Sequence, residues 1–282
     1  MKAMPRSLTI ASRARQAFLP ALVLALTIAC GADEAPDAPA AEPATSGSSG
    51  GASAGGSDDT AGTSGPTLLG PGEGGAVSGR VVHSGPVEAG TVAVTGDAFC
   101  IGAAQEMGGL PDQSLVVGDG GLAHAFVYVD VDTDAWEFPE ASGEVVIDQV
   151  GCLYTPRVVG VRVKQDLTFV NSDATLHNVH TTGINKENNV AMPVEGMRKT
   201  VSMRKPEVMG KVACDVHPWM AGWFGVMEHP CFAVTDGQGR FSIAGVPPGE
   251  HTLKIWHETL GTREVQVTVT AGGTATVDDV SL

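Results

Sequence analysis

Runs in which apolar and polar residues alternate recur through the second half of the chain. The alternation is clear in residues 157–163 and 263–269, and residues 167–170 form a shorter, mostly apolar run. A period of two is typical of half-buried β-strands. Turn sequences such as Gly85–Pro86 separate the apolar runs. Together with 37 Gly and 17 Pro residues, this pattern predicts an all-β chain of short strands and turns.

The region before residue 141 carries further strand signals. Residues 75–140 are β-rich, with short strands at 75–82 and 90–95 and a stronger one at 123–131. These strands either form a unit of their own or extend the sandwich expected for residues 141–230, and both interpretations stay open.

Residues 1–29 predict a secretory signal. Four cations and no acid precede an apolar run at 17–29 that is too short to span a bilayer comfortably. The small residue before Cys30 and the glycine after it resemble a bacterial lipobox, although Thr27 stands where Leu is usual. We therefore expect an exported protein, periplasmic or held at the outer membrane only through a lipid on Cys30. An ordinary signal peptide is the alternative.

Residues 30–74 are of low complexity. Ala, Gly, Ser, Pro and Thr dominate, with scattered acids and almost no large apolar side chains. Such a segment cannot bury enough surface to offset its ordering entropy, so it predicts a disordered linker. About 40 flexible residues have a root-mean-square span of roughly 35 Å, which suits a tether between a membrane and a folded head.

The charge balance restricts the partners. The formal charge is −15, and removal of the four cations in residues 1–29 would lower it to −19. So acidic a protein is a poor candidate for binding nucleic acid, whose phosphates would repel it. We expect it to be steered towards a redox protein with a basic docking surface.

Four residues offer metal-binding side chains in a distinctive arrangement. Cys214, His217 and Met220 lie on one short stretch, and His177 lies upstream on a predicted strand. Residues three apart on a strand point to opposite faces, so the stretch must curl into a loop, which Pro218 stiffens. One thiolate, two imidazoles and a weak axial thioether are the donors of a type 1 copper site. Zinc is a poorer match, because a thioether is an uncommon zinc ligand.

The loop from Cys214 to Met220 resembles the C-x-x-H-P-x-M loop of the cupredoxin family, and most closely that of amicyanin. Residues 171–179 likewise resemble the family segment that delivers the first histidine ligand. The resemblance implies a Greek-key β-sandwich for residues 141–230 that holds one copper ion on the four residues named above.

The same resemblance assigns roles to neighbouring residues. It implies that Asn178 supports the ligands from outside, by tying the histidine strand to the cysteine loop through its backbone. It also implies that Pro218 and Trp219 belong to an apolar patch around an exposed edge of His217, through which electrons pass. One departure concerns residues 211–213, which are Lys-Val-Ala where the family has an aromatic residue shortly before the cysteine. The usual shielding of the sulfur is therefore in question.

His180 is an ambiguous candidate ligand. On an extended strand it faces away from His177, three residues earlier, so a surface histidine is the favoured interpretation. The alternative makes it an additional ligand, or the true one.

Five cysteines bear on this site: Cys30, Cys100, Cys152, Cys214 and Cys231. Export would place them in an oxidising compartment. If Cys214 binds copper, the most economical disulfide joins Cys100 to Cys152 and leaves Cys231 over. The alternative, a Cys214–Cys231 disulfide, would abolish the metal site. The sequence cannot choose between them, because four cysteines allow three full pairings.

Residues 231–282 predict a second, smaller sandwich. Turns at 236–239 and 245–249 alternate with strand-like runs at 240–243, 251–256 and 263–269. This pattern resembles the transthyretin-like sandwich of the carboxypeptidase regulatory-like family, whose role is structural or adhesive. The combination with a cupredoxin-like segment resembles exported bacterial proteins labelled as methylamine-utilisation-like.

Three functions remain after this comparison. The favoured one is an exported one-electron carrier with one type 1 copper ion. The second is a copper-binding or copper-delivering protein, and six methionines in residues 192–227 bear on it. The third is a structural cell-surface protein without a redox role. We do not expect an enzyme, because we find no paired carboxylates, Ser/His/Asp set or phosphate-binding loop in a supporting context.

Overall fold

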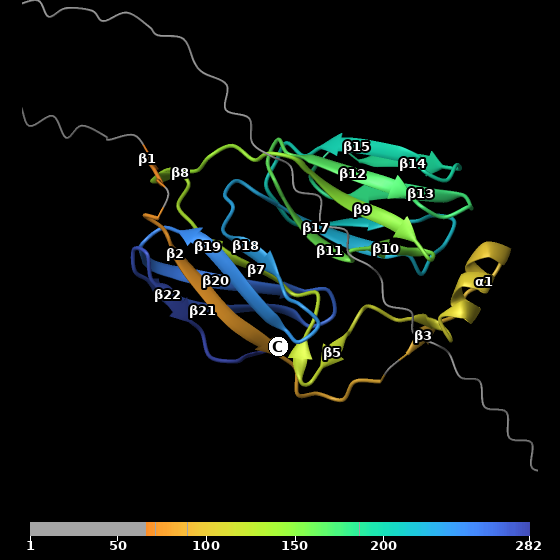
Figure 1. Ribbon diagram of the computed structural model, residues 1–282, viewed down its shortest axis with the longest axis horizontal. Helices are drawn as coiled ribbons and strands as arrows, with labels where there is room; N and C mark the ends of the chain where they lie inside the picture. The colour runs from red at the N-terminus through yellow and green to blue at the C-terminus, as the bar shows by residue number, and fades with distance from the viewer. Residues whose placement is uncertain (1–65, 71, 89, 186) are drawn as a thin grey trace, which may run out of the picture. The chain divides into compact units, whose positions relative to one another are not determined.

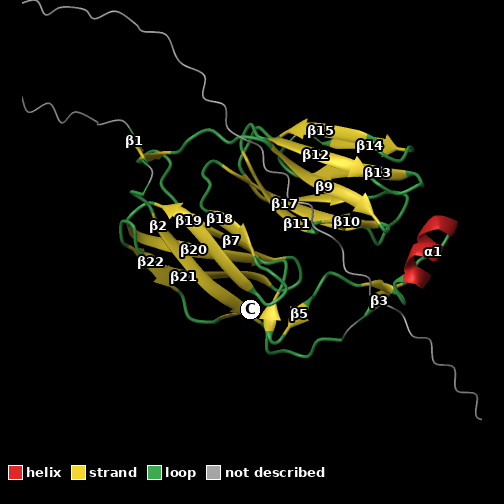
Figure 2. Cartoon of the chain, viewed as in Figure 1, coloured by secondary structure: helices red, strands yellow, loops and turns green. Residues whose placement is uncertain are grey.

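The chain folds almost entirely into strands over the part that the structure describes. This computed structural model describes residues 66–282 apart from residues 71, 89 and 186. Strands dominate, and one α-helix, α1 (Ala98–Glu106), accompanies them in this part (Figures 1 and 2). No helix among the described residues is long and apolar enough to cross a membrane. The predicted signal peptide, Cys30 and most of the predicted linker lie outside the described residues.

Residues 144–227 form a two-sheet arrangement that we call the middle sandwich. One sheet has the order β10 (Leu153–Thr155), β9 (Glu144–Val150), β12 (Asp166–Asn171), β15 (Arg198–Ser202). The other has the order β11 (Val158–Arg162), β17 (Ala221–Met227), β16 (Glu207–Ala213), β13 (His177–Thr182), β14 (Asn188–Met192). Alternating side chains of both sheets, such as Phe169, Val179 and Phe224, meet in one buried core.

A second arrangement, the terminal sandwich, combines strands from both ends of the described chain. One sheet has the order β18 (Phe232–Val234), β7 (Phe126–Asp130), β20 (Gly249–His257), β21 (Gly261–Val269). The other has the order β19 (Arg240–Val246), β2 (Gly75–Val82), β6 (Gly121–Leu122), β5 (Val117–Gly118), and β22 (Thr274–Thr276) and β23 (Val280–Ser281) also pair with β2. Val77, Val127 and Ile255 belong to its core.

The strands of residues 75–140 thus pair with the C-terminal strands. β2 pairs antiparallel with β19, and β7 lies between β18 and β20. The all-β prediction is confirmed, and the two long strands of the β-rich region extend the terminal sandwich rather than the middle one.

The predicted linker extended too far towards the C-terminus. Thr67–Leu68 form β1, which pairs in parallel with β8 (Trp136–Glu137). The backbone N–H of Leu69 donates to the carbonyl of Glu137, and the Leu69 side chain is buried. One buried leucine and a strand partner fix this short segment although its composition is that of a linker.

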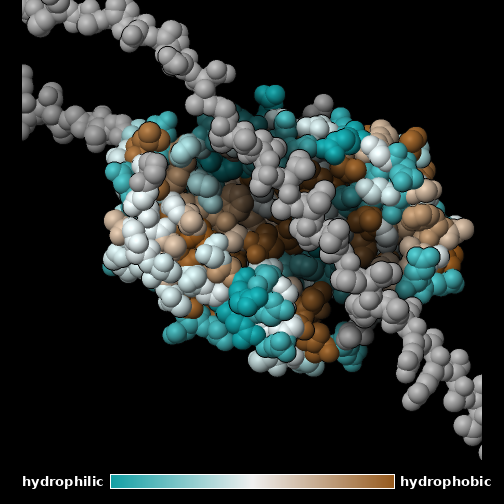
Figure 3. All heavy atoms as spheres, in the orientation of Figure 1, coloured by the Kyte–Doolittle hydropathy of each residue, from teal (hydrophilic) through white to brown (hydrophobic). Residues whose placement is uncertain are grey.

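Helix α1 was not predicted from the sequence. It begins after Asp97, whose side chain caps the helix by accepting from the backbone N–H of Cys100, and it is flanked by the short pair β3 (Thr91–Val92) and β4 (Leu110–Pro111). Cys100 is its one buried side chain. Apolar surface therefore remains outside, at the right-hand end of the face shown in Figure 3.

Candidate metal centre

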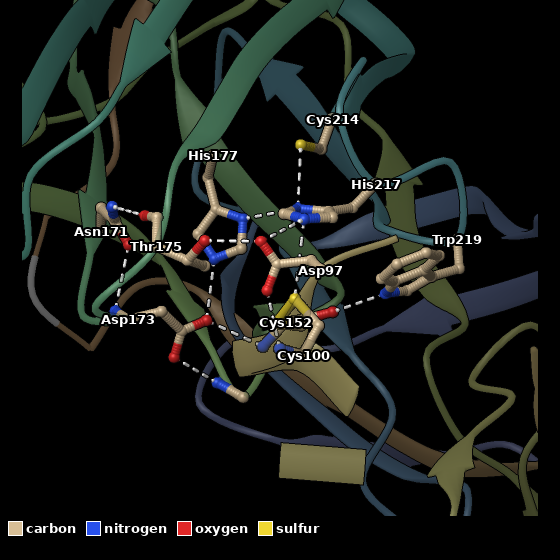
Figure 4. Close-up of a disulfide and its surroundings, with 11 residues drawn as sticks. Asp97, Cys100, Cys152, Asn171, Asp173, Thr175, His177, Cys214, His217 and Trp219 are labelled. Atoms are coloured by element: carbon tan, nitrogen blue, oxygen red, sulfur yellow. Dashed lines mark hydrogen bonds and ion pairs between the residues drawn. A yellow bond between two sulfur atoms is a disulfide. The ribbon is translucent and has the colours of Figure 1, made fainter. Parts of the chain in front are cut away.

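One strand and one loop of the middle sandwich bring three metal-binding side chains together. His177 begins β13, and Cys214 and His217 lie on the loop between β16 and β17. Nδ1 of His177 lies 3.0 Å from Nδ1 of His217, and Sγ of Cys214 lies 3.7 Å from the same His217 atom (Figure 4). All three side chains are buried. They form a donor group that could hold a metal ion.

The loop folds back on itself through its own backbone. The N–H of Met220 donates to the carbonyl of His217 at 2.9 Å, and the N–H of Cys214 donates to the carbonyl of Met220 at 3.2 Å. Ala213 and Ala221, at its two ends, are paired in adjacent strands. This closed curl turns Cys214 and His217 inwards, and it leaves the Met220 side chain buried in the same core.

Asp173 orients His177. Nε2 of His177 lies 2.8 Å from Oδ2 of Asp173, and the two carboxylate oxygens accept backbone N–H bonds from Gly151 and Cys152. The ring therefore donates through Nε2 and presents Nδ1 to the cluster. Burial lowers the pKa of His177, but the bonds to Asp173 and to the thiol of Cys214 outweigh it and raise the pKa to about 9. A metal ion binding at Nδ1 would therefore have to displace a proton at neutral pH.

His217 is covered, in contrast to the exposed edge that the family resemblance implied. Its side chain is 1% exposed. Nε2 lies 3.6 Å from Sγ of Cys100 and 3.6 Å from Oδ2 of Asp97, so the N-terminal end of α1 closes this side of the ring. Burial lowers the pKa of His217, and the charge of His177 lowers it further, against the opposing effect of Asp97.

The structure joins Cys100 to Cys152 by a disulfide, with a Cα–Cα distance of 5.6 Å. Cys214 and Cys231 are both free and buried. Cys231 belongs to the core of the terminal sandwich, whereas Cys214 belongs to that of the middle sandwich. The alternative Cys214–Cys231 disulfide therefore does not form in this structure, and the Cys214 thiol remains available to a metal.

Tyr154 stands beside the cluster and was not predicted to. Its hydroxyl oxygen lies 2.5 Å from the carbonyl oxygen of Asn178 and 3.1 Å from that of Ala213. The hydroxyl therefore donates to the backbone next to His177 and next to Cys214. Its ring belongs to the same buried core as Cys214. An aromatic from β10 thus lies near the sulfur, where the sequence lacks the family's aromatic before the cysteine. No local signal in the sequence could have shown this, because the contact is long-range.

His180 lies apart from the cluster. Nδ1 faces Oδ1 of Asp215 at 2.9 Å, and Nε2 faces Oε1 of Glu187 at 2.9 Å. Both ring nitrogens are thus engaged by carboxylates near the surface. The side chain of Asn178 accepts from the backbone N–H of Asp215 and donates to Asn189, which ties the histidine strand to the cysteine loop.

Pro218 and Trp219 extend from the same loop. Pro218 is exposed and Trp219 is half-buried. The indole N–H of Trp219 donates to the carbonyl of Cys152 at 3.1 Å, and its ring centroid lies 5.1 Å from that of His217. The Trp219 ring therefore packs against the imidazole and the disulfide together.

The donor group suits a thiophilic transition metal. A thiolate with two imidazoles matches the ligand preferences of copper and zinc, and a thioether donor from Met220 on the same loop would favour copper. The two Nδ1 atoms and the sulfur converge in a buried space, and Asp173 supplies the outer hydrogen bond that metal-bound histidines use. The residues present therefore fit a copper ion.

Comparisons with known proteins match different parts of the chain. Residues 231–282 match the family model of the carboxypeptidase regulatory-like domain. No curated protein sequence matches the chain.

Several solved structures of copper proteins are similar to part of the chain. They include a reduced amicyanin variant at 24% identity, covering 31% of this chain and 85% of that chain with a TM-score of 0.28. A purple cupredoxin from Nitrosopumilus maritimus has 22% identity, with coverage of 29% and 99% and a TM-score of 0.26. A copper-containing nitrite reductase from Thermus scotoductus has 24% identity, with coverage of 36% and 25% and a TM-score of 0.28.

Proposed function

We propose that the protein is an exported one-electron carrier with a single type 1 copper ion on His177, Cys214, His217 and Met220. The observation that carries this proposal is the convergence of two imidazole nitrogens and one thiol in a buried space. The fourth donor, Met220, comes from the same hydrogen-bonded loop.

The chain's own residues prepare the site. Asp173 accepts the Nε2 proton of His177 and thereby leaves Nδ1 to face the cluster. Tyr154 holds the backbone beside His177 and Cys214, so both strands keep their spacing. The bound copper would supply a one-electron couple, and burial of its donors would keep water away from it. A rigid, dry donor set is favourable for electron transfer because little has to move when the charge changes.

An electron carrier fits this site better than an enzyme. All four proposed ligands belong to the protein, and Cys100 and Asp97 cover the outer nitrogen of His217. A catalytic metal site keeps an open position for water or substrate. The closed surroundings of His217 therefore support the transfer of electrons without the binding of a substrate at the metal.

Copper delivery is the second candidate function, and the burial of the methionines disfavours it. A delivery protein would present several thioethers to Cu(I) at its surface. Of the six methionines in residues 192–227, four are buried and two are half-buried. They fill the core, as methionine commonly does.

The proposed setting follows from the N-terminal sequence and the charge. We propose export by residues 1–29, anchoring through Cys30 and a flexible tether before the folded part. The net charge of −15 favours a redox partner with a basic surface.

A copper titration tests the proposal. The full-length apo-protein is titrated with Cu(II) while its visible spectrum is recorded. We expect a strong blue or green thiolate-to-copper band that saturates at one equivalent and is bleached by ascorbate.

Two cysteine variants provide the matched comparison. Cys214→Ser should abolish the band, and Cys231→Ser, which replaces the other free buried cysteine, should leave it unchanged. A folded protein with a free Cys214 thiol and no band would refute the proposed function.

A further inference from the structure

Only Cys100 separates the exposed surface of α1 from the proposed copper ligand His217. Cys100, the one buried side chain of the helix, has its sulfur 3.6 Å from Nε2 of His217. Its neighbours in sequence, Phe99 and Ile101, are exposed to solvent. A molecule bound to α1 would therefore come close to the donor group without entering it.

This surface is apolar at its centre. Phe99, Ile101 and Met107 are 38%, 37% and 48% exposed. Beside them lies a groove of about 370 Å³, lined by residues that include Val92, Val94, Ile101 and Leu110. We call this helix surface with its groove the α1 face; Figure 3 shows apolar atoms over it. Exposed apolar patches of this kind mark contact sites.

The surroundings of the α1 face are acidic. Residues 81–112, the segment that carries α1 and its flanking strands, contain four Asp and Glu residues and no Lys or Arg. The four acids are Glu88, Asp97, Glu106 and Asp112. Among the described residues, Glu106 and Asp112 form no ion pair with a cation. Their negative field is therefore available to a partner.

We propose that the α1 face is the docking surface for a basic redox protein, whose apolar contact area is surrounded by Lys or Arg. The proposal rests on the proposed function, since one electron would pass between the copper site and the partner's redox centre, with no bond made or broken and no proton moved. The acids beside the α1 face, Glu88, Glu106 and Asp112, complement a basic partner. They disfavour a second copy of this chain, which would carry the same charges.

Binding of cytochrome c, a basic haem protein with an exposed haem edge, tests the surface without copper. The full-length apo-protein is titrated with ferricytochrome c by calorimetry at about 0.01 M ionic strength. We expect Glu106→Lys, at an exposed site on α1, to weaken binding about tenfold, and Ile101→Ser to weaken it about threefold. The control Glu250→Lys reverses an exposed charge on β20 of the terminal sandwich and should change binding by less than about twofold.

Electron transfer provides the second measurement. The oxidation rate of the reduced, copper-loaded protein by cytochrome c should fall about tenfold in Glu106→Lys and converge with wild type at about 0.5 M salt. Oxidation by ferricyanide, a small reagent, tests the copper function of the wild type independently. Absence of both a blue band and any reaction with ferricyanide would refute the proposed function. Weaker apo-protein binding in Glu106→Lys than in Glu250→Lys would support the docking surface independently of copper.

Three results would overturn the docking proposal. The first is equal weakening by Glu106→Lys and Glu250→Lys, which would mean unspecific attraction. The second is loss of electron transfer in Trp219→Lys but not in Glu106→Lys, which would place the contact at the ligand loop. The third is a concentration-dependent dimer abolished by Ile101→Ser, which would assign the face to a second copy.

Discussion

Oδ2 of Asp173 lies 2.8 Å from Nε2 of His177 and also accepts the backbone N–H of Cys152. One carboxylate thus connects a proposed copper ligand to one half of the disulfide. Asp173 is itself held by Asn171, whose Oδ1 accepts the backbone N–H of Asp173 at 3.0 Å. The orientation of His177 therefore depends on Asp173, four positions earlier in the chain, and on the hydrogen bond by which Asn171 holds Asp173.

Replacing Asp173 with Asn should weaken copper binding. The variant loses the charged partner of Nε2, and removal of such an outer partner typically costs about tenfold to a hundredfold in metal affinity. Competition with a chelator of known affinity measures the change. Asp166→Asn, at an exposed position at the start of β12, is the control and should bind copper like the wild type. Equal affinities in both variants would show that Asp173 does not orient the ligand.

Replacing both Cys100 and Cys152 with Ser should open the site. Without the disulfide, Cys100 no longer anchors α1, which then depends on contacts such as the hydrogen bond from Thr175 to Asp97. His217 therefore becomes accessible to external ligands. We expect azide to perturb the visible copper band of the double variant but not that of the wild type or of Cys231→Ser. The apo-protein should also lose roughly 2–4 kcal/mol of unfolding free energy in urea, because the disulfide spans 52 residues. An azide-insensitive double variant would mean that something other than Cys100 shields His217.

Tyr154→Phe should loosen the link between the two ligand strands. The change leaves the buried carbonyl of Asn178 and the partly buried carbonyl of Ala213 without the hydroxyl that now lies within 3.1 Å of each. A lost donor in such a place costs about 1–3 kcal/mol. Urea unfolding of the apo-protein measures it, and Tyr128→Phe in the terminal sandwich is the control. Similar losses in the two variants would assign no special role to the Tyr154 hydroxyl.

The terminal sandwich should lose stability in mild acid. Burial lowers the pKa of His257 to about 4 from its ordinary value of 6.5. As the pH falls through this interval, the unfolded chain gains the proton first, so stability decreases from about pH 6.5 down to about pH 4. The expected slope is up to about 1 kcal/mol per pH unit for this histidine.

Urea midpoints across that pH range measure the effect. His257→Gln should reduce the slope, whereas His251→Gln, a partly exposed histidine on the same strand, should leave it unchanged. His229, whose pKa burial also lowers to about 4, contributes in the same direction and accounts for a residual slope. A slope identical in all three proteins would contradict the assignment to His257.

The strands and the ligand loop could be predicted because their signals are local. Period-two alternation marks half-buried strands such as β21, and the spacing of Cys214, His217 and Met220 within one loop is itself the sign of a metal site. His177 could be added because of the resemblance of its own segment. Nothing in these arguments required knowledge of distant contacts.

The surroundings of the loop could not be predicted for the opposite reason. Asp97, Cys100 and Tyr154 reach the site although they lie 59 or more positions before Ala213, the residue next to Cys214. Sequence spacing carries no information about such contacts. Helix α1 was missed because the Gly-rich and Pro-rich composition of the chain masked a short Ala-containing segment with an Asp cap.

The terminal sandwich cannot be completed until the last part of the chain has been synthesised. β2 and β7 precede the whole middle sandwich in sequence, yet their partners β18, β19 and β20 follow it. The middle sandwich is therefore an insertion within the other unit, and all of its strands are available first. During synthesis it can fold before the partners of β2 and β7 have been made. Residues 231–282 alone would lack the strands at the centre of both sheets, so this segment is part of a folding unit and not a whole one.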